Sequence, residues 1–275
     1  MFKNLVLISF ISLPLASENL LDIYNEALDN DPQYKSSEYS LLAGKEFVVQ
    51  GRAGLLPNVT LSGSTNWNEY YQFDELQSAY NNNSVTARLT QPLFRLDSWF
   101  NFKRLKKLTD ASEADFAYAQ QNLIIRTVEK YFGVLRAIDN LNAAVSEEKA
   151  IKKQLDQIQQ RFEVGLSAIT EVQEAQLAYD LSVAAKIRSE GALFNAREEL
   201  NSLIGREIFS IDSLKADIVP ENPNPTTKQE WVDIALKNNY RLQASVLRRD
   251  ASQDSARSSA SEHLPKINIV GTESE

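Results

Sequence analysis

From Leu93 to Val164 the chain reads LFRLDSWFNFKRLKKLTDASEADFAYAQQNLIIRTVEKYFGVLRAIDNLNAAVSEEKAIKKQLDQIQQRFEV. These 72 residues contain no proline and a single glycine, Gly133. Since an α-helix rises about 1.5 Å per residue, one continuous helix of this length extends roughly 108 Å, several times an ordinary domain helix. A globular core cannot bury such a helix along its whole length, so the sequence predicts a structure built on helical length.

A second proline-free stretch follows Gly165, with Gly191 as its only glycine up to Ile204. We therefore expect a long helix over 94–164, a return helix over 167–204 and a tip near Arg161-Phe-Glu-Val-Gly-Leu166. Positions spaced by three and four in the first helix predict a heptad seam with left-handed supercoiling, broken only by a glutamate. These positions are Val134, Ala137, Leu141, Ala144, Glu148, Ile151, Leu155, Ile158 and Phe162.

The return helix has a weaker seam. Its expected positions are Ile169, Val172, Gln176, Tyr179 and Val183, followed by Leu193, Ala196, Leu200 and Leu203. The gap of ten residues between Val183 and Leu193 indicates a shift of register. Small and polar seam residues suit a curved wall that bounds water on one side, and a plain intramolecular coiled coil is the alternative.

Composition and the N-terminus narrow the class of protein. Residues 1–17 predict a secretory signal peptide, with a basic start, an apolar run from Leu5 to Leu15 that is too short to span a bilayer, and small residues at Ala16-Ser17. The alternative is a buried first helix. The chain of 275 residues has no cysteine, which suits a periplasmic or outer-membrane protein, and its net charge of −8 argues against a nucleic-acid partner.

Two membrane strands are predicted after a helical region at 20–55 that is interrupted near Pro32 and ends at Leu55-Leu-Pro57. Residues 58–67 and 84–93 alternate apolar and polar side chains over the length of a tilted transmembrane strand, and residues 68–83 are predicted to be a loop. An exposed hairpin on a soluble protein is the alternative. The candidate membrane and interface residues are Val59, Leu61, Trp67, Val85, Ala87, Leu89 and Trp99.

An internal repeat follows a proline-containing linker at 206–225. At a constant offset of 208 residues, Ala27-Leu28 matches Ala235-Leu236 and Leu56-Pro57 matches Leu264-Pro265. We expect residues 18–225 to form a first structural repeat and residues 226–275 to be the truncated start of a second. The downstream gene is then expected to encode further strands and a second long hairpin.

Several short motifs agree with a known family. They are Glu18-Asn-Leu, Leu55-Leu-Pro57, Thr90-Gln-Pro-Leu-Phe94, Tyr131-Phe-Gly-Val-Leu135 and Arg161-Phe-Glu-Val-Gly-Leu-Ser-Ala-Ile-Thr-Glu171. With these motifs the chain resembles the TolC family of outer-membrane efflux proteins. The resemblance implies a mainly α fold with a small membrane β-portion. It also implies a homotrimer whose helical hairpins form one α-barrel and whose protomers, when complete, each give four strands to one outer-membrane β-barrel.

The resemblance also assigns roles at the tip. It implies that Val164, Gly165 and Leu166 dock on a periplasmic adaptor protein, which is joined to an inner-membrane efflux pump or ABC transporter. It further implies that Thr170 and Glu171 latch the closed tip, although the best-known member of the family has aspartate in place of Glu171. The alternative is local helix capping, because Thr170 and Gln173 have the spacing of a capping box.

The function implied is a passive conduit through the outer membrane for drugs or exported polypeptides. The chain offers no catalytic, cofactor-binding or metal-binding constellation, since it has no cysteine and its only histidine, His263, has no second histidine and no constellation of carboxylates near it. We therefore expect no enzyme activity. The rival function is a periplasmic coiled-coil adaptor or scaffold without a pore.

Overall fold

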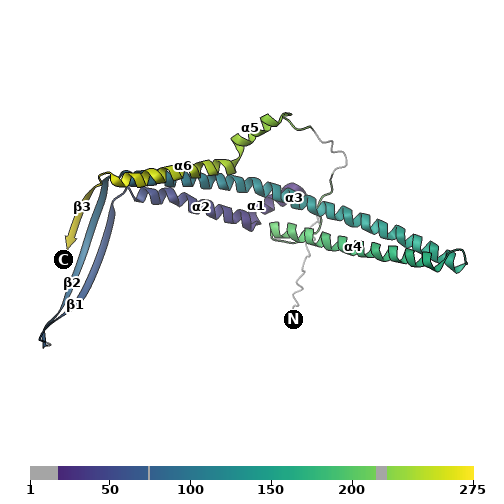
Figure 1. Ribbon diagram of the computed structural model, residues 1–275, viewed down its shortest axis with the longest axis horizontal. Helices are drawn as coiled ribbons and strands as arrows, with labels where there is room; N and C mark the ends of the chain where they lie inside the picture. Colours follow the sequence, from purple (N-terminus) through teal and green to yellow (C-terminus); the bar gives the residue numbers. More distant parts are fainter. Residues whose placement is uncertain (1–17, 74, 215–221) are drawn as a thin grey trace, which may run out of the picture. The chain divides into compact units, whose positions relative to one another are not determined.

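The computed structural model describes residues 18–73, 75–214 and 222–275, and the predicted signal peptide at 1–17 lies outside them. Helices predominate, and the strands form one small sheet (Figure 1). The elements are α1 (Leu20–Asn30), α2 (Pro32–Ala53), β1 (Asn58–Gln72), β2 (Glu75–Phe94), α3 (Leu96–Glu163), α4 (Ile169–Ile204), α5 (Lys228–Asn238), α6 (Tyr240–Ala260), a 3-10 turn (Ser261–His263) and β3 (Ile267–Ser274).

Two compact units make up the fold. The hairpin unit takes the chain up to Lys35 and from Gln120 to Pro223, and the strand unit takes Ser36–Ala119 and Asn224–Glu275. These units do not coincide with the two predicted repeats, because α3 is shared by both units. Its 68 residues run without interruption from Leu96 to Glu163.

Local polar contacts set the break between α1 and α2. The side chain of Asn19 accepts hydrogen bonds from the backbone N–H groups of Leu21 and Asp22, which caps α1. Asp31 leaves helical geometry, and Pro32 begins α2, where its missing N–H costs no helical hydrogen bond. The buried Asp31 carboxylate accepts from Tyr34 N–H at 2.8 Å and pairs with the guanidinium of Arg126.

The core of the hairpin unit lies where α1 meets α3 and α4. Ile23 and Ala27 of α1 are fully buried, in one cluster with residues of both long helices. The other buried members are Leu123, Tyr131, Val134, Ala137, Leu193, Leu200, Leu203 and Ile204. This core fixes the open end of the α3–α4 hairpin, opposite its tip.

In the strand unit, α2 and α6 pack on different sides of α3. Gly44 and Gly51 of α2 bring its backbone close to α3, and the Thr109 hydroxyl donates to the Gly44 carbonyl at 2.9 Å. The contact with α6 is polar. The Ser258 hydroxyl donates to the Asp97 carbonyl at 2.8 Å, and the buried carboxylate of Asp254 lies 3.1 Å from the ammonium of Lys107.

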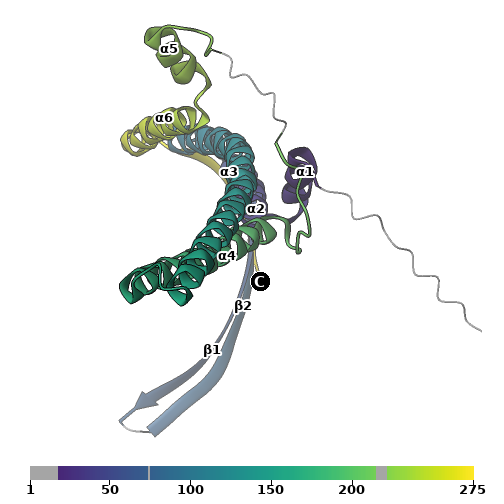
Figure 2. The same cartoon turned by 90° about the vertical axis from the view of Figure 1, so that its right-hand side faces the viewer.

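The sheet is antiparallel with the order β1-β2-β3. Figure 2 shows β1 and β2 side by side as a long hairpin. Val59 pairs with Leu89, and Leu61 pairs with Ala87. On the other edge of β2, Leu89 pairs with Gly271 of β3. The second segment of the predicted repeat therefore joins the same sheet as the first.

The prediction of a loop at 68–83 is wrong for most of these residues. β1 continues to Gln72 and β2 begins at Glu75, so only a tight turn at Phe73 separates the described parts of the two strands. Asparagine, glutamine and tyrosine in this region suggested a loop, yet the cross-strand ladder continues through them. The Thr65 hydroxyl, for example, lies within hydrogen-bonding distance of the side-chain oxygens of Asn81 and Asn83.

The elements also follow the offset of 208 residues. α5 spans Lys228–Asn238, which is α1 displaced by 208, and α6 begins 208 residues after α2. Both α5 and α6 carry side-chain caps, from Thr227 and Asn239 respectively. The linker expected at 206–225 lies partly outside the described residues.

Among the described residues, no helix combines the length and the apolar character required to cross a membrane.

Substitution of Gly44 tests the close packing of α2 on α3. A Cβ at this position would lie 2.5 Å from the Cβ of Ser112, so Gly44→Ala is expected to lower the free energy of unfolding by about 1–3 kcal/mol. Gly191→Ala is the matched control, because nothing lies within 4 Å of its added Cβ and alanine favours a helix by about 1 kcal/mol. Urea unfolding followed by circular dichroism measures both, and equal effects of the two substitutions would contradict the packing described here.

Candidate docking tip, helical seam and strand face

The tip between α3 and α4 is a Schellman turn. Gly165 has φ of +77°, and its N–H donates to the Phe162 carbonyl at 2.9 Å while Leu166 N–H donates to the Arg161 carbonyl at 2.8 Å. Glycine is favoured there because a side chain in the left-handed region costs roughly 1–2 kcal/mol. Val164 and Leu166 flank it with 69% and 70% of their surfaces exposed, so the turn presents two apolar side chains to solvent.

The structure brings Thr170 and Glu171 to the first turn of α4, beside this tip. The N-cap is Ala168, which makes no side-chain cap, so the alternative of a capping box between Thr170 and Gln173 is wrong. Instead, the Ser167 hydroxyl donates a short hydrogen bond to the Glu171 carboxylate. Glu171 is exposed, and its position in the first helical turn is favourable for the helix dipole.

The seam of α4 continues without the predicted shift of register. Its inward positions keep spacings of three and four, and they include small residues such as Ala175 and Ser182, both buried. The full series is Val172, Ala175, Tyr179, Ser182, Lys186, Ser189, Leu193, Ala196, Leu200 and Leu203. The predicted seam missed Ala175, Ser182, Lys186 and Ser189, because small and charged residues add nothing to an apolar pattern.

An ion pair occupies the middle of this seam. The Lys186 ammonium lies 3.1 Å from the Glu148 carboxylate of α3, and both side chains are partly shielded, at 33% and 21% exposure. The hydrogen bond to Glu148 raises the pKa of Lys186. Glu148, which interrupts the predicted seam of α3, is therefore matched by a partner on the opposite helix.

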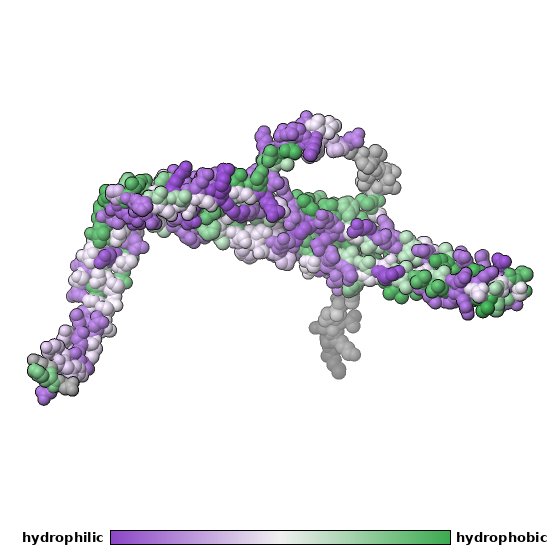
Figure 3. Space-filling model, in the orientation of Figure 1, coloured by the Kyte–Doolittle hydropathy of each residue, from purple (hydrophilic) through white to green (hydrophobic). Residues whose placement is uncertain are grey.

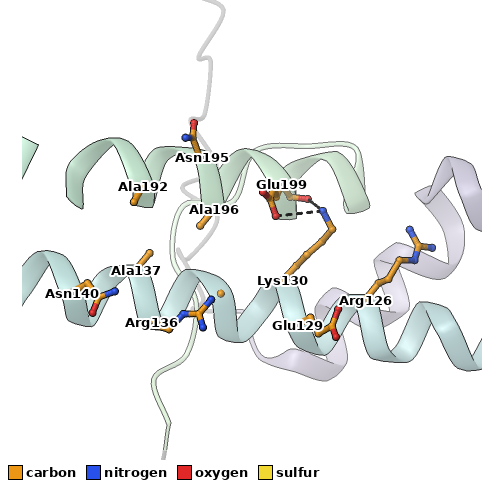
Figure 4. Close-up of a pocket in the computed structure, with 11 residues that line it drawn as sticks. Arg126, Glu129, Lys130, Arg136, Ala137, Asn140, Ala192, Asn195, Ala196 and Glu199 are labelled. Carbon is orange, nitrogen blue, oxygen red and sulfur yellow. Dashed lines mark hydrogen bonds and ion pairs between the residues drawn. The ribbon is translucent and has the colours of Figure 1, made fainter. Parts of the chain in front are cut away.

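A groove of about 570 Å³ separates α3 from α4 nearer the open end of the hairpin (Figure 4). Small residues from both helices line it, and a charged rim surrounds them. The lining residues are Arg126, Glu129, Lys130, Gly133, Arg136, Ala137, Asn140, Ala192, Asn195, Ala196 and Glu199. Lys130 spans the rim and donates to the Glu199 carbonyl at 3.0 Å. This groove was not predicted from the sequence, although small residues at facing helical positions were its signal.

The predicted membrane residues of the strands share one face of the sheet. The cross-strand pairs Val59–Leu89 and Leu61–Ala87 place them opposite one another, and Val85 faces Gly63. Val59 and Leu61 are 71% and 76% exposed. On the other face, Ser64 and Ser84 share a hydrogen bond of 2.9 Å, so the hairpin has one apolar and one polar face, and neither is covered.

Charged residues brace the junction between the strands and α3. Arg95 forms an ion pair with Asp97 at 2.6 Å, and Lys266 approaches the same carboxylate at 3.5 Å. The Arg95 guanidinium, through its hydrogen bonds, holds the pKa of Asp97 well below its usual range. Trp99, two residues after Asp97 on α3, has 42% of its surface exposed.

In the part of the chain that the structure describes, no group of three or more histidine, cysteine, aspartate or glutamate side chains could hold a metal ion.

The fold is a long helical hairpin joined to an amphipathic strand hairpin, and the sequence identifies its family. Residues 23–206 match the outer membrane efflux protein family, and the chain belongs to this family.

Named relatives support this family membership, and a solved structure shares the fold. The outer membrane protein TolC of Vibrio cholerae is 33% identical over 261 residues, which cover 95% of this chain and 59% of that protein. The alkaline protease secretion protein AprF of Pseudomonas aeruginosa is 27% identical over 263 residues, with 92% of this chain and 54% of that protein covered. The outer membrane channel CmeC of Campylobacter jejuni has a similar fold, with a TM-score of 0.75 at 17% identity over 95% of this chain and 62% of that one. The chain thus spans little more than half the length of the curated relatives it matches.

Charge reversal tests the ion pair in the seam. Lys186→Glu is expected to lower the melting temperature of the helical hairpin, because it places two carboxylates together in a partly shielded seam. The double variant Glu148→Lys with Lys186→Glu is expected to recover most of that loss, as measured by thermal unfolding followed at 222 nm by circular dichroism.

Salt and pH provide the controls. The loss of melting temperature in the single variant should be smaller in 1 M salt, because screening weakens the repulsion between like charges. Since the pKa of Lys186 is raised by folding, the contribution of the wild-type pair is fully present below the pKa of an unfolded lysine and is lost as the pH rises above it. Equal melting temperatures for the single and double variants would contradict the pairing.

Proposed function

We propose that this protein is the outer-membrane conduit of a tripartite efflux or type I secretion system. One observation carries the proposal: a single chain of the efflux family joins a strand hairpin with an exposed apolar face to a long helical hairpin with an exposed tip. An apolar strand face is stable in lipid only when the strands pair with further strands. We therefore place the strands in the outer membrane and the helices in the periplasm.

The assembly proposed is a homotrimer. α4 carries apolar side chains outside its seam, and several are more than half exposed within one chain. They are Leu177, Leu181, Ile187 and Phe194. Neighbouring helices of a closed helical wall would cover such a stripe. Cargo would pass through the enclosed space under the action of an inner-membrane pump or ABC transporter, while this chain performs no chemistry.

A coiled-coil adaptor or scaffold is the rival function. It would share the helical hairpin, but it would have no use for a strand hairpin whose apolar residues align on one face. The name of the relative AprF, an alkaline protease secretion protein, favours export of polypeptides as one activity of this group. Drugs are the other cargo class that we retain.

The docking proposal concerns the tip. Leu166→Asp is expected to weaken binding of the periplasmic adaptor from the same host by about tenfold or more, because burial of a leucine side chain contributes roughly 1.5–3 kcal/mol. Gln157→Asp is the matched control, since it adds the same charge to an exposed residue of α3 without removing an apolar contact. The affinity of each variant for the purified adaptor is measured. Equal affinities of the two variants would show that the tip is not the docking site.

The latch proposal concerns Glu171. The native protein in a planar lipid bilayer is expected to show a low single-channel conductance that Glu171→Ala increases, because loss of the carboxylate removes an anchor between neighbouring tips. Ser167→Ala is the control, as it removes the local partner of Glu171 and leaves the carboxylate in place.

Each outcome separates the latch from the conduit. Unchanged conductance in Glu171→Ala would refute the latch alone. Absence of any channel, together with recovery of the native protein in a soluble periplasmic fraction without detergent, would refute the conduit and favour the scaffold.

A further inference from the structure

The first turns of α3 carry four basic residues, and only two of them have a hydrogen-bond or ion-pair partner among the described residues. The guanidinium of Arg104 donates to the Asn101 side chain, and the Lys107 ammonium pairs with Asp254. Lys103 and Lys106 are exposed, and neither belongs to an ion pair among the described residues. Two uncompensated ammonium groups therefore lie on α3, close to the point where β2 ends.

These two lysines share a helix face with Trp99. The spacings from residue 99 to 103 and 106 are four and seven, and because each residue turns a helix by about 100°, the three side chains project in one direction. The two lysines lie between the neighbours of α3: α2 contacts α3 at Phe102 and Thr109, and α6 contacts it at Lys107. Between these contacts, the side chains of Lys103 and Lys106 remain exposed.

Aromatic rings hold one of the ammonium groups. The Lys103 Nζ atom lies 5.6 Å from the ring centroid of Trp99 and 5.6 Å from that of Phe100. The cation–π contact orients the lysine beside an indole that remains 42% exposed. Figure 3 shows apolar residues gathered at this end of the strands, where the strand hairpin meets the helices.

This arrangement fits the border of a bilayer. An exposed tryptophan favours the region of the lipid headgroups and glycerol backbone, while lysine side chains attract the phosphates of anionic lipids. We propose that Trp99, Lys103 and Lys106 form a binding face for the phosphate of an anionic phospholipid, at the leaflet where the strands end. The proposal rests on the membrane placement of the strands under the proposed function. Continuity with the exposed apolar Leu93 and Phe94 at the end of β2 selects a lipid rather than free phosphate as the occupant.

The test uses Trp99 as a fluorescent reporter in the native protein. Trp67→Phe and Trp231→Phe remove the other two tryptophans. The protein is reconstituted in bilayers that contain equal mole fractions of phosphatidylglycerol or phosphatidylcholine, with bromine on the acyl chain near the headgroup as the quencher. Quenching by brominated phosphatidylglycerol is expected to exceed quenching by brominated phosphatidylcholine, with a preference of about fivefold for each lysine.

Variants of the two lysines test whether these residues cause the preference for phosphatidylglycerol. Lys103→Gln with Lys106→Gln is expected to remove the preference for phosphatidylglycerol while quenching itself persists. Lys153→Gln, at an exposed lysine much further along α3, is expected to leave it unchanged. Equal quenching by the two lipids in the wild type, or loss of the preference in Lys153→Gln alone, would overturn the headgroup site.

Conductance measured on the same samples separates the two proposals. Channels without quenching of Trp99 by either lipid would show that this face borders water or protein, and they would overturn the lipid site while the conduit stands. Absence of channels, together with recovery of the native protein in a soluble periplasmic fraction without detergent, would overturn both.

Discussion

The seam between α3 and α4 is the constraint on which the hairpin unit depends. A helix of 68 residues cannot be held by one core, so its stability must come from contacts repeated along its length. The seam meets this requirement with a position every three or four residues, and each helix buries only one stripe. The wide exposed faces that remain are available to other helices and to water, which is the geometry that a wall requires and a globular domain avoids.

The middle of the seam shows how little apolar burial this arrangement needs. The seam passes through Ser182, Lys186 and Ser189, which are poor coiled-coil residues, because Lys186 forms an ion pair with Glu148. A paired charge in a partly wet seam stabilises only modestly, and its loss on one side is unfavourable. The core around Ile23 supplies the apolar burial that the seam lacks.

Much of the fold was predictable because it rests on local chemistry. The absence of proline determined the two long helices, and Gly165 marked the turn that its φ of +77° requires. Alternation identified the apolar strand face to which Val59 and Leu89 belong. The predictions failed where a residue depends on a distant partner. Glu148 looked like an interruption of the α3 seam until Lys186 was placed beside it, and the polar strand residues around Asn81 looked like a loop until their cross-strand neighbours were known.

The repeat shows why a sequence pattern identifies a face but not its burial. Ile23 and Ala27 of α1 are fully buried against α3 and α4, whereas Trp231 stands in the place of Ile23 in α5 and is 45% exposed. The difference lies in the surroundings: α1 rests on a hairpin, and α5 has no buried residue among those described. Burying a side chain of this size stabilises by roughly 1.5–3 kcal/mol, and α1 gains this contribution only because the hairpin supplies a helical surface against it. The apolar pattern that α1 and α5 share therefore marks which face can be buried, while the neighbouring helices decide whether it is buried.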